Sequence, residues 1–93
     1  MLKVKREKVE DYCELRRTVT YYDKIKDEEK AHKYFSKLSH VGISFSDDFA
    51  ETREEKHKTL SVGLLITSLL MIDEMFPIDV IIRCIESCDI EVV

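Results

Sequence analysis

An abrupt change of character within the stretch Glu51–Ile72 constrains this chain more than any other feature of its sequence. The eight residues of Glu51–Lys58 are all polar and six of them carry charge, whereas the fourteen residues of Thr59–Ile72 carry none. A membrane-spanning helix needs about twenty apolar residues, and Asp73 and Glu74 end the uncharged run before that length is reached. The run therefore predicts a helix that is covered by protein, and we expect no membrane span.

At helical spacing, the uncharged run presents two apolar sides. Val62, Leu65, Leu69, Ile72 and Phe76 fall on one side, and Leu60, Leu64, Met71 and Met75 fall on the other, with the small residues Gly63 and Thr67 between them. A chain of 93 residues buries only a modest core, so covering both sides from within is difficult. We therefore predict a homo-oligomer built on the helix around Thr59–Phe76, with an interface made by Leu60, Gly63, Leu64, Thr67, Met71 and Met75. The alternative is a monomer in which three other helices wrap this one.

Apolar residues in steps of three and four predict further helices on both sides of this segment. One helix is expected over residues 3–22, although residues 18–22 could by propensity form a short strand. A second helix begins at the cap Asp27 and stops near Gly42. Whether residues 3–38 form one helix or two is left open.

The central helix is expected over about residues 47–76, with Ser46 as its N-cap and with Phe45 and Ala50 as a hydrophobic staple. Pro77 ends this helix and opens a fourth, whose apolar face repeats at Ile78, Ile81, Ile82, Ile85 and Cys88. The tail, residues 89–93, either pairs as a strand or docks in an extended form. The predicted fold is a single all-α domain over residues 1–93, a compact bundle of about four helices that self-associates.

Charge is distributed unevenly along the chain. Residues 1–40 hold eleven Lys or Arg against eight Asp or Glu, a balance of +3, and residues 41–93 hold four against eleven, a balance of −7. Basic residues interleave with acids throughout and the isoelectric point is about 5.4, which disfavours duplex nucleic acid as a partner. Two cationic groups are candidates for binding a small anion, and tyrosines beside the first could stack on a ring. These candidates are Arg16, Arg17, Tyr21 and Tyr22 in the first group, and Arg53, Lys56, His57 and Lys58 in the second.

Residues suited to catalysis or metal binding are present, but their spacing is not typical of a site. With only Gly42 and Gly63, the chain has no phosphate-binding glycine loop. Cys84 and Cys88 have a spacing that two zinc ligands can use, yet no second Cys or His pair accompanies them, and we interpret them as core residues. We expect no cofactor, no bound metal and no enzymatic activity. Three cysteines and a charged N-terminus without a signal peptide favour the cytoplasm.

Small size and the lack of catalytic motifs favour a non-catalytic protein-binding or regulatory module, such as an adaptor, an inhibitor or an antitoxin-like accessory protein, that acts as a homo-oligomer with a protein partner. Two alternatives belong to other classes of protein. The first is an oligomer that binds a small anionic, nucleotide-like ligand where subunits meet. The second is a hydrolase that uses one of the histidines.

Overall fold

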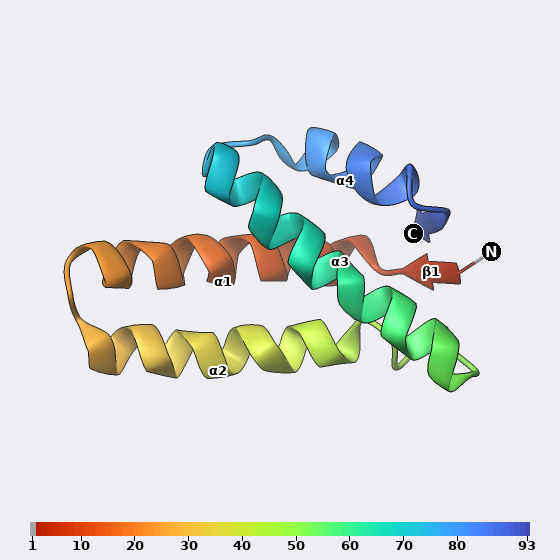
Figure 1. Ribbon diagram of the computed structural model, residues 1–93, viewed down its shortest axis with the longest axis horizontal. Coiled ribbons are helices and arrows are strands. Elements are labelled where there is room, and N and C mark those ends of the chain that lie inside the picture. Colours follow the sequence, from red (N-terminus) through yellow and green to blue (C-terminus); the bar gives the residue numbers. More distant parts are fainter. Residues whose placement is uncertain (1) are drawn as a thin grey trace.

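The computed structural model describes residues 2–93 and is mostly helical, as the sequence predicts. In chain order, the elements within those residues are β1 (Leu2–Val4), α1 (Arg6–Lys24), α2 (Glu28–Ser44), α3 (Arg53–Ile72), α4 (Ile78–Glu86) and β2 (Ile90–Val92). α1 and α2 run antiparallel side by side, α3 crosses them obliquely, and α4 turns back toward the end where both termini lie (Figure 1). The predicted bundle of four helices is confirmed, and two short strands are added to it.

A tight turn separates α1 from α2, which answers the question of one helix or two. Lys26 in this turn has a φ of 59°, a left-handed conformation that a lysine adopts at a cost. Asp27 caps α2 as predicted, since its side chain accepts a hydrogen bond of 3.2 Å from the backbone N–H of Lys30. The expected stop at Gly42 is wrong, because α2 continues to Ser44. The residues of 18–22, where a strand was the alternative, are helical.

The predicted start of the central helix is also wrong. α3 begins at Arg53 rather than at residue 47, and its predicted end is wrong too, because it stops at Ile72 rather than at residue 76 and Asp73 after it is extended. Thr52 is its N-cap, accepting a hydrogen bond of 3.1 Å from the backbone N–H of Glu55 and donating its hydroxyl to the carboxylate of the same residue. Ser46, the predicted cap, is buried and donates to the carbonyl of Ile43 instead. The physical reason is that Phe45 is buried in the core, and residues 45–49 form turns that precede the start of α3.

A short parallel ladder joins the two ends of the described chain. Leu2 lies opposite Ile90 and Val4 opposite Val92, and the backbone N–H of Val93 donates to the carbonyl of Val4 at 2.9 Å. The tail therefore pairs as a strand, one of the two predicted outcomes. Leu2, Val4 and Ile90 are buried, so the ladder covers one end of the core.

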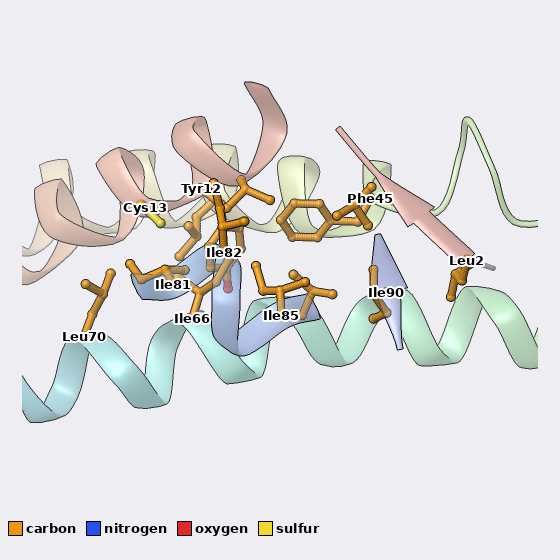
Figure 2. Close-up of a cluster of buried hydrophobic side chains, with 14 of the residues drawn as sticks. Leu2, Tyr12, Cys13, Phe45, Ile66, Leu70, Ile81, Ile82, Ile85 and Ile90 are labelled. Carbon is orange, nitrogen blue, oxygen red and sulfur yellow. The ribbon is translucent and has the colours of Figure 1, made fainter. Parts of the chain in front are cut away.

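The core lies where α1, α3 and α4 meet, with isoleucines of α4 between the other two helices (Figure 2). Ile81, Ile82 and Ile85 are buried as their spacing predicts. Tyr12 of α1 packs on Phe45 with ring centroids 5.4 Å apart and lies against both glycines. A Cβ atom at Gly42 would come within 3.3 Å of the Tyr12 ring, and one at Gly63 within 3.0 Å of its hydroxyl. Both glycines therefore permit close approach of α2 and α3 to Tyr12.

Candidate functional site

One side of α3 packs on the core and another side is open. The core side is formed by Thr59, Val62, Gly63, Ile66 and Leu70, all of them buried. On the open side, exposure is 41% for Leu60, 72% for Leu64, 78% for Met71 and 77% for Ile72, and Met75 in the turn just after α3 is 76% exposed. We call these five residues the α3 stripe. Exposed apolar side chains are common singly, but four on one helix without an intervening charge, with a fifth just beyond Asp73 and Glu74, are a feature of interaction sites.

The predicted interface residues separate into two groups in the structure. Leu60, Leu64, Met71 and Met75 lie in the stripe, exposed within this chain. Gly63 instead faces inward against Tyr12, and the Thr67 hydroxyl lies 3.4 Å from the Tyr12 hydroxyl. Ile72 was expected on the covered side, but it is exposed. Because α1 approaches closely at Gly63, the buried face is rotated toward Gly63 and Ile66 from the position that the apolar spacing alone indicates.

Apolar surface continues from the stripe onto α2. A shallow groove of about 170 Å³ lies between α2 and α3, and its lining is formed by Tyr12, Phe35, Leu38, Ser39, Gly42, Ile43, Leu60, Gly63 and Leu64. Phe35 and Ile43 at its rim are each at least half exposed. Ala31 and Leu38 of α2 are buried, whereas Phe35 is half exposed, so α2 leaves this part of its apolar surface open to water.

The first predicted cationic group is divided among three different roles. Arg17 donates from Nε to the carbonyl of Glu74 and from Nη2 to that of Phe76, both at 2.8 Å, so it holds the turn between α3 and α4. Arg16 lines a hollow of about 440 Å³ together with Thr20, Lys24, Leu70, Met71, Ile72, Asp73 and Glu74. Tyr21 is exposed.

Tyr22 packs on another aromatic ring, so this face of its ring is not open to a ligand. Its ring stacks on that of Tyr34 from α2, with centroids 5.5 Å apart and planes 7° apart. Lys30 lies 5.6 Å from the Tyr22 ring centroid, while Lys33 and Lys37 lie 5.9 and 5.1 Å from that of Tyr34. Sequence reasoning missed this cluster. The signal was present, because no Asp or Glu occurs between Glu29 and Asp47, which leaves α2 basic along most of its length.

The second predicted cationic group lies in the first two turns of α3, and Arg53, Lys56, His57 and Lys58 are all exposed. None of the four forms an ion pair with another described residue. Within one chain the two groups do not meet, since the N-terminal end of α3 and the C-terminal end of α1 lie at opposite ends of the long axis (Figure 1).

The cysteines and acids offer little chemistry in this arrangement. Cys13 is buried, and burial raises the pKa of its thiol to about 11. The interpretation of Cys88 as a core residue is wrong, because it is exposed, with its thiol 3.6 Å from the carbonyl of the half-buried Cys84. No group of three His, Cys, Asp or Glu side chains suited to a metal ion occurs in residues 2–93. The pKa of Asp48 is lowered chiefly by its hydrogen bond from Lys8, with a second contribution from Lys5.

None of the helices in residues 2–93 combines the length and the apolar character that crossing a bilayer requires. No protein-family model, curated protein or solved structure matches the chain. A functional assignment therefore depends on the geometry of the surface, and among residues 2–93 the α3 stripe holds five of the ten exposed large hydrophobic side chains.

Proposed function

We propose that this protein is a small non-catalytic regulatory module that binds another protein, in the manner of an adaptor, an inhibitor or an antitoxin, and that it acts as a homo-oligomer. The observation that carries the proposal is the α3 stripe. Leu60, Leu64, Met71 and Ile72 lie on α3 and Met75 lies in the turn just after it, and four of these five side chains are more than 70% exposed. A second copy seated on the stripe would shield apolar surface from water in each partner.

The charges around the stripe favour another protein chain as its occupant. No charged residue interrupts Thr59–Ile72, while basic residues precede it and acidic residues follow it. An apolar centre with a charged rim is the usual anatomy of a protein interface. Association through the α3 stripe would leave the basic side of α2 exposed to solvent. Lys30, Lys33 and Lys37 on that side of α2 are complementary in charge to an acidic surface on a regulated partner.

A second candidate function, binding of a small anionic ligand between subunits, has one specific observation in its favour. The hollow bordered by Arg16 and Lys24 adjoins Met71 and Ile72 of the stripe. A second copy seated on the stripe would form a further wall of this hollow, and it could contribute cations from Arg53, Lys56 or His57. A nucleotide-like anion would then bind where two chains meet.

Native mass spectrometry of gently purified protein separates these proposals. The protein-binding module predicts an oligomer without added mass, and the ligand binder predicts an oligomer that carries the mass of a nucleotide-sized molecule for each site. A monomer at all accessible concentrations would contradict self-association and, with it, the proposed role of the stripe. Pull-down with the wild-type protein against a Lys33→Glu variant then tests the acidic partner, with Lys3→Glu on β1 as the matched exposed control.

A further inference from the structure

A second groove lies between α1 and α2, which run side by side (Figure 1). Its hollow has a volume of about 390 Å³, and its lining is formed by Asp11, Glu14, Leu15 and Thr18 of α1 and by Tyr34 and Val41 of α2. Leu15, Tyr34 and Val41 are partly buried and pack against the core, so they form an apolar floor. We call this hollow the α1–α2 groove. It shares no lining residue with the groove between α2 and α3.

The edge of the α1–α2 groove on α1 is acidic. Asp11 and Glu14 lie three residues apart, so they project from neighbouring positions on one side of the helix, and both are exposed. Neither carboxylate forms an ion pair with another residue of 2–93. The α1 edge therefore presents two negative charges that this chain does not neutralise.

The edge of the groove on α2 is basic. Lys33 and Lys37 are exposed and lie 5.9 and 5.1 Å from the centroid of the Tyr34 ring, which places both ammonium groups beside the floor of the groove. Neither of these two lysines pairs with an acid of the described chain, and Lys30 reaches only Asp27, at 4.0 Å. A positive edge thus lies across the floor from a negative edge, and the charges of the two edges do not pair with each other.

The two edges disfavour some occupants and favour another. Duplex nucleic acid or an anionic bilayer is wide enough to meet Asp11 and Glu14 when it contacts the lysines, and the net charge of −4 opposes it further. A small anion would leave the acidic edge and the apolar floor uncovered. A protein segment with an apolar centre, acids on one flank and bases on the other is complementary to the floor and to both edges.

The backbone of the groove favours a helical segment over an extended one. The walls of the groove are α-helices, α1 and α2, whose backbone N–H and C=O groups pair within the helix itself. An extended segment would therefore find no backbone partners in the walls. A helix satisfies its own backbone groups and presents only side chains to a groove.

We infer that the α1–α2 groove binds an amphipathic helix of another protein, whose acidic flank lies along the α2 lysines and whose basic flank lies along the α1 carboxylates. This inference rests on the protein-binding function proposed above and specifies the partner. Because the two flanks differ in charge, the groove also determines the direction in which the helix lies. The same helix turned end to end would place acid against acid and base against base, which disfavours that arrangement.

Two synthetic helical peptides of identical composition test this inference. Both carry a stripe of leucines. In the segregated peptide, glutamates occupy one flank and lysines the other, whereas in the mixed peptide both residues alternate on both flanks. Fluorescence anisotropy of the labelled peptides measures their dissociation constants at low salt. The segregated peptide should bind the wild-type protein about tenfold more tightly, because charge pairs form along both edges only with this peptide. Apolar contact with the α3 stripe is common to both peptides and does not affect the ratio.

Reversal of the basic edge should remove this preference. Lys33→Glu combined with Lys37→Glu makes both edges acidic, so the two peptides should bind this variant equally. Lys3→Glu combined with Arg83→Glu is the matched control, because it changes the net charge by the same amount at two exposed positions outside the groove. The control should keep the preference of the wild type. Circular dichroism establishes that both variants are folded.

Exchange of both edges supplies a rescue that a merely unfolded variant could not show. Adding Asp11→Lys and Glu14→Lys to the Lys33→Glu and Lys37→Glu variant makes the α1 edge basic and the α2 edge acidic. The segregated peptide should then bind as tightly as it binds the wild type, lying in the opposite direction. A preference that the exchange does not restore would contradict the pairing of opposed edges with opposed flanks.

Two further outcomes would overturn the inference. Equal binding of the two peptides by the wild type would show that the edges do not distinguish the flanks. A polyglutamate peptide that binds as tightly as the segregated one would reduce the site to the basic row of α2. Neither outcome contradicts the proposed protein-binding function, which fails separately if the native mass is that of a monomer and the pull-down retains no partner.

Discussion

If two chains associate through the α3 stripe as proposed, replacement of Leu64 by serine should weaken this dimer without harming the fold of each chain. Leu64 is 72% exposed within one chain, so its contacts with its own core are few. Burying a whole leucine side chain is worth about 1.5–3 kcal/mol, so covering the exposed part is worth about 1–2 kcal/mol. Both copies carry the change, and the total loss is therefore about 2–4 kcal/mol per dimer, or roughly 30- to 1,000-fold in dissociation constant.

Sedimentation velocity over a series of concentrations measures this constant directly, and circular dichroism reports whether the helices persist. Ile25→Ser is the matched control, because Ile25 is also an exposed apolar residue, at 53%, but lies in the turn between α1 and α2. The reasoning is refuted if Leu64→Ser dimerises as tightly as the wild type. It is also refuted if Ile25→Ser weakens the dimer to the same extent, since the effect would then not depend on α3.

The remaining predictions concern the stability of the single chain, so each is measured in the Leu64→Ser background, where the proposed self-association is weakened. Lys26→Gly should relieve the left-handed backbone of its turn and stabilise the chain by about 1 kcal/mol, raising Tm by about 4–8 °C; an unchanged or lower Tm would contradict the strain. Gly63→Ala should cost about 1 kcal/mol in urea unfolding, because overpacking against Tyr12 exceeds the gain in helix propensity. Tyr12→Phe removes the hydroxyl, which is the atom nearest to a Cβ at Gly63. Gly63→Ala should therefore cost less stability in a Tyr12→Phe background, and an equal cost would show that the clash is not with this hydroxyl. The pKa of Asp48 is lowered from 3.8 on folding, so its contribution to stability is present above pH 3.8 and is lost as pH falls through the folded-state pKa. Asp48→Asn should therefore destabilise the chain more at pH 7 than at pH 2 in urea unfolding, and an equal loss at both values would exclude its ionisation as the cause.

The helices that follow from local chemistry were predictable, and the features that depend on distant contacts were not. Asp27 caps α2 as expected because a cap needs only its own first turn. Ser46 also has the side chain and the neighbours of an N-cap, but Phe45 packs against Tyr12 in the core, and the chain there does not start a helix. A better signal for the start of α3 was available, since Thr52 and Glu55 have the spacing of a capping box. The ladder between β1 and β2 had no local signal, because each strand is three residues long and meets its partner across nearly the whole described chain.

The candidate surface was predictable in part for the same reason. Helical spacing alone indicates that Leu60, Leu64 and Met71 share one side of α3, and these residues are exposed; Met75, which the spacing places with them, is exposed in the turn after the helix. The same spacing does not reveal which side of α3 is buried in the core. Tyr12 decides this, because its ring fills the space above Gly63 and draws that residue inward. The stacking of Tyr22 on Tyr34 also depends on two helices meeting, and it removes Tyr22 from the group that sequence reasoning assigned to a ligand.

The ladder that joins β1 to β2 has a consequence for the order in which this protein can fold. α1 and α2 are neighbours in sequence and can pair as soon as both are synthesised, since closing a short loop costs little entropy. Leu2 and Val4 have no such neighbour, and they stay open to water until Ile90 has left the ribosome. The strand made first is therefore among the last to be covered, and during that interval a bare apolar edge is available to chaperones or to other nascent chains.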